Sequence, residues 1–371
     1  MYKLLFTFQK EVTRLAEDEM RRFGATPVRM VSDEVCLAET EANLFADSGQ
    51  SFVQPVRYAS ASRGVIAANP PIFVRHVCPA DYIMGWDESA DDIYGKTLSL
   101  IHSANLEAHP KSGRRKTIGI QARSVADVSA KPKGAALDAI HKAVDDSGVM
   151  RASGAPDIAL SVAFAQDEII MGISPALMNL SSFAGGSRRF ARTEDMVSRS
   201  EFKLLEAFET FRTVDSMDVF LHFKAEVHGR ALDLGAAPGG WSRILANMGY
   251  NITAVDPADL DARLADNERI THVKATAQEY ADSIRGNAVK FDLLANDMKM
   301  DSSLSARIVA QFREYIKPDG LVILTLKLHM GKFMRQINNA RMILEPRFDI
   351  IGIRQLFHNR SEVTLYAKPK P

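Results

Sequence analysis

From about residue 230 to the C-terminus, short apolar runs alternate with stretches in which apolar residues recur at helical spacing. Apolar runs of this length are typical of strands that are buried on both faces, and their alternation with helices favours a parallel sheet. The pattern predicts seven strands, at residues 230–234, 251–255, 270–274, 291–296, 321–326, 348–355 and 363–367. We therefore expect an α/β fold built on a mostly parallel, doubly wound sheet.

Two helices of this region are well marked. One is expected at 200–211, before the first strand, and the other at 304–315, where the pattern stops near Pro318-Asp319-Gly320. The residues between the last two strands, 358–361, are too few for a crossover helix. These two strands should therefore pair antiparallel.

The pattern before residue 179 is different. Strands are expected at 2–8, 28–31, 35–38, 116–124, 157–165 and 168–174, with helices at 12–23 and 135–144, whereas much of 40–100 gives no clear pattern. This mixture predicts an N-terminal α+β region at 1–100 and a second α+β region at 101–178. Residues 179–197, rich in small residues and arginine, are expected to be a linker to a third unit at 198–371.

Composition narrows the class of protein. The 371 residues, 46% of them hydrophobic, suffice for two or three cores. Lysine plus arginine and aspartate plus glutamate both number 46, so we expect any nucleic-acid contact to be local. No apolar run approaches the 18 or so residues of a membrane span. Cys36 and Cys78 form no metal-ligand pattern, so we expect a cytoplasmic protein without a disulfide scaffold or a bound metal.

The turn after the first predicted strand of the sheet is the strongest chemical signal. Gly235 lets the backbone approach a ligand closely, and Gly239 and Gly240 open a helix. The spacing matches neither a dinucleotide fingerprint nor a P-loop, so phosphate binding is disfavoured. Asp256 ends the next strand, 23 residues after Asp233, about where an acidic residue meets a ribose hydroxyl in doubly wound folds. An adenosine-containing ligand fits this arrangement.

The residues Asp-Leu-Gly-Ala-Ala-Pro-Gly-Gly-Trp at 233–241 resemble the S-adenosylmethionine loop of the FtsJ-like family of RNA ribose 2′-O-methyltransferases. This resemblance implies a Rossmann-like, seven-stranded class I methyltransferase domain with S-adenosyl-L-methionine as cofactor. Segments around 198–207, 296–298, 326–328 and 355–364 are similar to the members that methylate a cytidine of 23S ribosomal RNA. The element order before the linker resembles a ferredoxin-like THUMP region, an RNA-binding module.

Four charged residues stand in the order Lys203, Asp297, Lys327, Glu362, around this loop. Singly, a charged residue at a strand end is usually a solvated terminus, but the order is similar to the catalytic tetrad of the family. The resemblance implies that Lys327 is the proton acceptor, that Asp297 orients it, and that Lys203 and Glu362 position it and the ribose. Lys327 can accept a proton only when neutral, and we expect burial to lower its pKa, although the neighbouring carboxylates would raise it.

The resemblance also implies a set of cofactor contacts. They are Ser200, Asp233, Gly235, Ala237, Pro238, Gly239, Gly240, Trp241, Asp256, Thr276 and Asp297. One departure stands at 274–277, where the family has an acidic residue after the third strand and this chain reads Lys-Ala-Thr-Ala. The contact on the adenine side is therefore expected from Thr276 or from backbone.

RNA is the expected partner, and a monomer the expected state. Two basic clusters are candidates for phosphate contacts: Lys111, Arg114, Arg115 and Lys116, and, in the linker, Arg188, Arg189 and Arg192. Two alternatives stay open. The chain could methylate a small molecule or a protein, or it could be a noncatalytic RNA-binding protein that holds S-adenosylmethionine, since doubly wound sheets serve many functions.

Overall fold

The structure is a computed structural model that describes residues 1–45, 70–104, 115–152, 156–181, 183–212 and 229–371. The chain divides into two compact units, Met1–Arg188 and Arg189–Pro371, and the division falls within the stretch 179–197 that its composition marks as a linker. Among the described residues, no helix is both long enough and apolar enough to cross a membrane.

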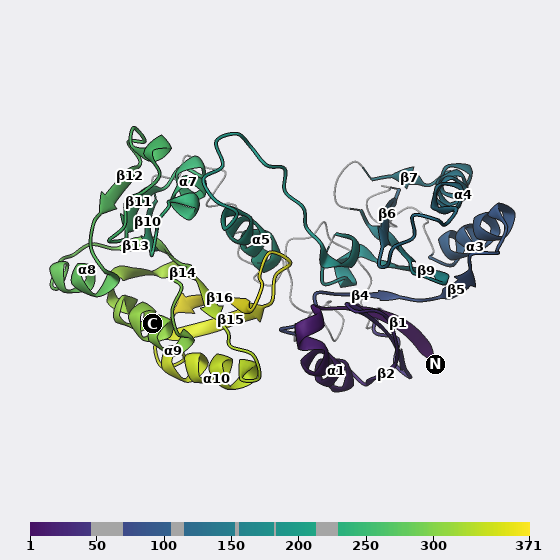
Figure 1. Ribbon diagram of the computed structural model, residues 1–371, viewed down its shortest axis with the longest axis horizontal. Helices are drawn as coiled ribbons and strands as arrows, with labels where there is room; N and C mark the ends of the chain where they lie inside the picture. Colours follow the sequence, from purple (N-terminus) through teal and green to yellow (C-terminus); the bar gives the residue numbers. More distant parts are fainter. Residues whose placement is uncertain (46–69, 105–114, 153–155, 182, 213–228) are drawn as a thin grey trace. The chain divides into compact units, whose positions relative to one another are not determined.

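The C-terminal unit contains a seven-stranded sheet (Figure 1). Its strands are β10 (Arg230–Leu234), β11 (Asn251–Val255), β12 (Ile270–Val273), β13 (Phe291–Asn296), β14 (Ile316–Lys327), β15 (Phe348–Arg354) and β16 (Glu362–Pro369). They lie in the order β12-β11-β10-β13-β14-β16-β15, parallel except for β16, which is antiparallel to both of its neighbours. The predicted α/β fold with a mostly parallel sheet is confirmed, as is the antiparallel pairing of the last two strands.

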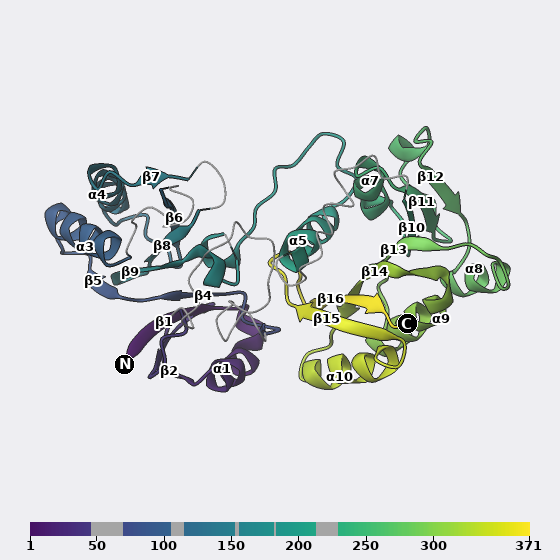
Figure 2. The same ribbon diagram turned by 180° about the vertical axis from the view of Figure 1, so that it is seen from behind.

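Helices cover both faces of this sheet (Figures 1 and 2). On one face lie α5 (Glu201–Arg212) and α7 (Gly240–Asn247), and on the other lie α8 (Ala277–Ser283), α9 (Ser302–Gln311) and α10 (Phe333–Leu344). Along α5 the apolar residues at helical spacing, Leu204, Phe208 and Phe211, are all buried against the sheet and α7. This packing fixes the start of α5 beside the carboxyl ends of the strands.

Strand β14 is longer than the predicted 321–326. Residue Ile316 already pairs with Phe291 of β13, and regular pairing resumes at Leu321 opposite Leu293, so residues 317–320 bulge out between the two paired stretches. The predicted helix at 304–315 is correspondingly divided, with α9 ending at Gln311 and a single 3-10 turn following it. Pro318 is tolerated in this bulge because residues there are not paired with a neighbouring strand, and proline has no N–H to donate.

The N-terminal unit contains two sheets. The first consists of β1 (Tyr2–Thr7), β2 (Ala25–Ser32), β3 (Val35–Thr40) and β4 (His76–Pro79), in the order β2-β3-β1-β4, together with the helix α1 (Thr13–Arg22). The second consists of β5 (Tyr82–Gly85), β6 (Thr117–Ser124), β7 (Met150–Arg151), β8 (Ile158–Phe164) and β9 (Glu168–Pro175), in the order β5-β9-β8-β6-β7. Helices α3 (Ala90–Ser103) and α4 (Lys133–Asp146) lie side by side on this second sheet (Figure 1). The unit is α+β, as predicted.

The boundary predicted near residue 100 does not coincide with the two sheets. Strand β5 pairs with β9, and α3 packs against α4. Both β5 and α3 therefore belong with the second sheet, although β5 and most of α3 lie before residue 100. Helix α3 starts at a capping box in which Ser89 and Asp92 satisfy each other's backbone N–H groups. That pair is visible in the sequence, but Gly95, Thr97 and the serines dilute the apolar pattern that follows it.

Candidate active site

The loop after β10 has the backbone shape that its glycines permit. Gly235 and Gly239 adopt positive φ angles of 72° and 104°, a region that other residues enter only with strain. A β-carbon on Gly235 would collide with the side chain of Met298, and one on Gly240 would collide with Ser198. The loop therefore presents bare backbone toward the end of β13 on one side and toward the start of α5 on the other.

Asp256 holds the loop from the neighbouring strand. Its Oδ2 accepts a hydrogen bond from the backbone N–H of Ala237 at 3.1 Å, and its Oδ1 accepts one from Ala258 at 2.8 Å. The carboxylate thus lies at the end of β11, directly against the glycine loop. The hydroxyls of an adenosine ribose bound here could donate hydrogen bonds to this carboxylate in place of the two backbone N–H groups.

Asp233 serves a different purpose from Asp256. It is buried, with 1% of its surface exposed, and its Oδ2 accepts a hydrogen bond from Ser242 Oγ at 2.7 Å. Burial raises the pKa of this carboxyl to about 7, against the opposing effect of the Ser242 hydrogen bond. This contact ties β10 to α7 behind the loop. The predicted contact of Asp233 with a cofactor stays a prediction.

The start of α5 is tied to α7 by contacts that the sequence analysis missed. Trp241 Nε1 donates a hydrogen bond to the carbonyl of Ser200 at 2.8 Å. The buried carboxylate of Glu201 pairs with Arg243, and its Oε1 also accepts from the N–H of Val197 at 2.7 Å. A glutamate in the first turn of a helix is usually an exposed favourable charge, so nothing in the sequence marked this one as buried.

Four predicted residues come together as a closed ring of charges. Lys203 Nζ lies 3.2 Å from Asp297 Oδ2 and 2.6 Å from Glu362 Oε1. Lys327 Nζ donates to Asp297 Oδ1 and, at 2.6 Å, to Glu362 Oε2. Each ammonium therefore touches both carboxylates, and the ring has no net charge. The four side chains are between 8% and 20% exposed, so they are largely buried yet reachable from solvent.

Sheet topology explains how residues 159 positions apart in the chain meet. Asp297 follows β13, and Lys327 ends β14, which is parallel to β13, so both lie at the same edge of the sheet. Glu362 begins β16 and is the direct antiparallel partner of Lys327 in the strand register. Ser302 holds the end of β14 by donating a hydrogen bond to the carbonyl of Lys327 at 2.5 Å. Lys203 reaches the same edge from α5.

The ring determines the charge state of Lys327. Burial lowers the pKa of this ammonium, but the charges of Asp297 and Glu362 and their hydrogen bonds outweigh it, so the net shift is upward. For Glu362 burial raises the pKa, and the two lysines lower it further than burial raises it. The expectation that burial would tip the net pKa shift of Lys327 downward is therefore wrong for this ring, because two carboxylates within hydrogen-bonding distance more than offset the effect of burial.

The predicted contact of Thr276 with a cofactor stays a prediction. Its hydroxyl donates to Glu279 Oε2 at 2.8 Å and accepts from the N–H of Glu279 at 3.2 Å. Glu279 Oε2 in turn accepts from the backbone N–H of Thr276 at 2.8 Å, which completes the capping box of α8. A ligand contact by this hydroxyl would compete with the cap. The remaining geometry fits an adenosine-containing methyl donor, because a bare glycine loop, the Asp256 carboxylate and Asp297 surround one end of the sheet.

The predicted RNA-binding residues are only partly described. Lys111 and Arg114 lie outside the described residues. Arg115 is exposed just before β6, and Lys116 is half-buried beside it. In the linker, Arg188 lies over the ring of Phe183 at 4.1 Å, whereas Arg189 and Arg192 are exposed. The division between the two units separates Arg188 from the other two arginines.

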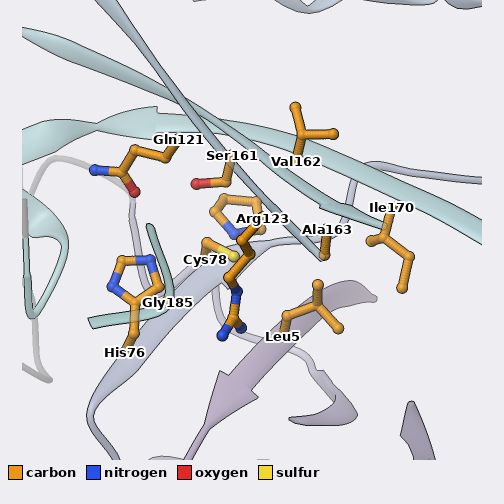
Figure 3. Close-up of a pocket in the computed structure, with 11 residues that line it drawn as sticks. Leu5, His76, Cys78, Gln121, Arg123, Ser161, Val162, Ala163, Ile170 and Gly185 are labelled. Carbon is orange, nitrogen blue, oxygen red and sulfur yellow. The ribbon is translucent and has the colours of Figure 1, made fainter. Parts of the chain in front are cut away.

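The N-terminal unit has a polar pocket between its two sheets (Figure 3). Its polar lining includes His76, Cys78, Gln121, Arg123 and Ser161, and the described residues around it include no carboxylate. Burial raises the pKa of the Cys78 thiol to about 11, so the sulfur is protonated and a poor nucleophile near neutral pH. Arg123 donates a hydrogen bond to Thr7 Oγ1 at 2.5 Å, which links the two sheets. In the described residues, no cluster of histidine, cysteine, aspartate and glutamate could hold a metal ion.

The comparison with protein families agrees with this geometry. Residues 196–347 match the model of the family described as FtsJ-like methyltransferase. This part of the chain is therefore similar to FtsJ-like methyltransferases. The match includes the glycine loop and three members of the charged ring, and it ends before the strand that carries Glu362.

Several relatives carry the name ribosomal RNA large subunit methyltransferase M. The one from Methylococcus capsulatus is 35% identical over 176 residues, which cover 45% of this chain and 46% of the relative. The one from Azoarcus sp. is 32% identical over 192 residues, 50% of each chain. The one from Thauera aminoaromatica is 27% identical over 310 residues, 81% of this chain and 79% of the relative. The chain thus spans about half the length of the first two relatives and more of the third.

Proposed function

We propose that this chain transfers a methyl group from S-adenosyl-L-methionine to the 2′-hydroxyl of an RNA ribose. The observation that carries the proposal is the ring of Lys203, Asp297, Lys327 and Glu362 at the carboxyl edge of the sheet, beside a glycine loop held by Asp256. A 2′-hydroxyl is a poor nucleophile near neutral pH, so it needs alignment and a proton acceptor. The ring supplies both.

Lys327 is the proton acceptor in this proposal. The cofactor, when bound by the glycine loop and Asp256, supplies a methyl group on a positively charged sulfur. Lys327 must be neutral when the ribose hydroxyl attacks, although Asp297 and Glu362 raise its pKa. The positive charges of Lys203 and of the cofactor's sulfur would oppose this rise in the pKa of Lys327, because like charges disfavour the protonated form. The hydroxyl proton then moves to the Nζ of Lys327, where the two carboxylates stabilise the ammonium that forms.

Asp297 and Glu362 orient the acceptor. Each carboxylate bridges both lysines, so the Nζ of Lys327 is held in one direction, and Lys203 keeps the carboxylates in place. A lysine with four flexible side-chain bonds would otherwise point at the hydroxyl only part of the time. The arrangement reduces the entropy that must be lost at the moment of transfer.

We infer that the substrate is large-subunit ribosomal RNA, at a cytidine of the 23S molecule. The names of the relatives support the RNA class, and the resemblance of segments 355–364 and 296–298 supports the nucleotide. In the same proposal the N-terminal unit is a THUMP-like RNA-binding region. Arg115 and Lys116 before β6 are its candidate phosphate contacts, and the exposed Arg189 and Arg192, which belong to the C-terminal unit, are further candidates.

The experiment that tests this function uses RNA from cells that lack the protein. Purified full-length protein and methyl-labelled S-adenosylmethionine are incubated with total RNA, and the labelled nucleotide is mapped. Label at a single cytidine 2′-oxygen of 23S RNA supports the proposal in full, and label elsewhere in RNA corrects the substrate. Transfer to protein or to small molecules, with none to RNA, would favour the first alternative, and no transfer at all would favour a noncatalytic binding protein. The Lys327→Arg variant is the matched control, because its guanidinium keeps the positive charge but stays protonated.

A further inference from the structure

Four aromatic rings gather in the C-terminal unit, and we name them the aromatic cluster: Phe190, Phe202, Phe357 and His358. The ring centroids of Phe202 and His358 lie 5.2 Å apart, and those of Phe190 and Phe202 lie 5.7 Å apart with nearly parallel planes. Phe357 meets His358 edge-on at 5.1 Å. All four side chains are only half-buried, so the cluster is not part of the sealed core.

The cluster borders the charged ring on two sides. Phe202 directly precedes Lys203 on α5, and His358 lies four residues before Glu362, in the connection between β15 and β16. Figures 1 and 2 both place this connection beside α5. The cluster and the charged ring therefore lie near one another, on α5 and on this connection.

Buried polar contacts hold the connection in place. Glu206 of α5 is 6% exposed, and its two carboxylate oxygens accept hydrogen bonds from the backbone N–H groups of Phe357 at 2.7 Å and of His358 at 2.9 Å. Asn359 Oδ1 accepts from the N–H of Leu356 at 2.8 Å. Burying a carboxylate against backbone donors is costly unless both oxygens are satisfied, as they are here. The result is a rigid connection that presents half-buried rings.

The surroundings of the cluster are basic. Arg189 precedes Phe190, Arg199 lies three residues before Phe202, and Arg360 follows the histidine by two positions; all three are exposed. Aromatic rings interleaved with arginines are the combination that binds single-stranded nucleic acid, in which bases stack on rings and phosphates meet cations.

We propose that the aromatic cluster receives the nucleobase of the nucleotide whose ribose is methylated. This inference rests on the proposed function. Because a base is joined directly to its ribose, a ribose held at the charged ring places its base on the adjoining surface. A base that is paired and stacked inside a double helix cannot reach such a surface, so the substrate nucleotide is unpaired or turned out of its helix.

The first test measures stacking directly. Full-length protein is titrated into a nine-nucleotide oligocytidylate that carries 2-aminopurine at its centre, whose fluorescence falls when the base stacks on a ring. We expect the wild type to quench the probe, Phe202→Leu to quench it far less, and Phe202→Tyr to restore the quenching. Leucine keeps the apolar packing of Phe202 and removes only the aromatic face, so a merely structural role would leave the signal unchanged.

The second test compares affinities for the oligocytidylate and for an abasic nonamer with the same phosphates. Stacking of a base on a ring typically contributes about 5- to 150-fold in affinity by alanine substitution. The wild type should prefer the oligocytidylate by a factor in that range, and Phe202→Leu and His358→Leu should bring the ratio toward one. Tyr2→Ala, which removes a 45% exposed ring from the N-terminal unit, is the control and should leave the ratio unchanged. Calorimetric binding of S-adenosylmethionine verifies that each variant is folded.

The outcomes separate this inference from the proposed function. Equal quenching and equal affinity ratios for wild type and Phe202→Leu, with methyl transfer to RNA intact, would overturn the inference alone. Quenching that depends on Phe202, in a protein that methylates no RNA, would overturn the proposed function and leave a nucleobase-binding surface. Loss of cofactor binding in Phe202→Leu would show that the ring is needed for packing, and the affinity ratio of His358→Leu would then decide.

Discussion

The charged ring of the C-terminal unit and the polar pocket of the N-terminal unit both collect ionisable side chains, but they do so in different places. The ring stands at the carboxyl edge of a parallel sheet, and its two ammoniums and two carboxylates balance each other. The pocket lies between two sheets, where Arg123 reaches across to Thr7 and no described lining residue is acidic (Figure 3).

This difference bears on what each set of residues can do. In the ring, a proton can pass between groups that are each held by charged partners and that retain contact with solvent. In the pocket, burial raises the pKa of Cys78 to about 11 and lowers that of Arg123, because burial disfavours the charged form of each group. Buried ionisable groups are thus not by themselves a sign of catalysis; the position at a strand edge and the balance of charges distinguish the ring.

The largest expected effect comes from the ring. Lys327→Ala should reduce methyl transfer by about 100- to 10,000-fold, which is the usual contribution of a positioned proton acceptor. Binding of S-adenosylmethionine should be nearly unchanged, because the acceptor acts on the ribose hydroxyl. Single-turnover rates on RNA and calorimetric titration measure the two quantities. Turnover near that of the wild type would remove Lys327 from the mechanism.

The two units can also be separated. A fragment that starts at Arg189 should fold and bind S-adenosylmethionine, since the seven-stranded sheet and its helices have their own core. It should methylate RNA at least about tenfold more slowly and with weaker salt dependence, because phosphate contacts in the N-terminal unit are lost. Rates across a salt series for fragment and full chain provide the measurement. Equal behaviour would mean that the N-terminal unit does not recruit RNA.

A smaller effect is expected at the glycine loop. Asp256→Ala should weaken binding of S-adenosylmethionine by about tenfold or more, or roughly 1.5–3 kcal/mol, through loss of a charge-assisted hydrogen bond. Asp256→Asn keeps one carbonyl acceptor for the loop N–H groups, so its affinity for S-adenosylmethionine should lie between those of the wild type and the alanine variant. Calorimetry gives both constants, and an unchanged value for the alanine variant would contradict the placement of the cofactor.

The ring should also set the pH dependence of transfer. Lys327 must lose its proton to act, so the rate should rise with pH toward its raised pKa. Asp297→Asn removes one of the charges that raise that pKa, and the rising limb of the profile should therefore move to lower pH. The diagnostic quantity is the midpoint of the profile, whatever the height of its plateau. A midpoint that stays fixed or moves upward would exclude Lys327 as the group that titrates.

The smallest expected effect is in the polar pocket. Cys78→Ala should leave methyl transfer and cofactor binding unchanged and should lower the melting temperature slightly, because a buried side chain is shortened. Thermal melts and transfer rates on the same preparations provide the comparison. A marked loss of transfer without a loss of stability would show that the pocket takes part in function after all.

Local pattern was sufficient to predict much of the C-terminal unit. The predicted strands 230–234, 251–255 and 291–296 coincide with β10, β11 and β13, because strands buried on both faces leave a continuous apolar run. Shorter and more polar elements show no continuous apolar run in the sequence, so the pattern did not predict them. The edge strand β7 has only two residues, both exposed, and α3 is interrupted by small and polar residues.

What the sequence alone determined is which residue types stand at which strand ends, including the glycine loop and the order Lys203, Asp297, Lys327, Glu362. What only the tertiary structure decided is how they meet. Strand β16 inserts between β14 and β15, which sets Glu362 opposite Lys327, and the contact between α5 and α7 brings Lys203 to the same edge. The upward pKa shift of Lys327 follows because this arrangement places Asp297 and Glu362 against its ammonium group. Strand order and charge balance depend on distances between residues far apart in the chain, which no local pattern encodes.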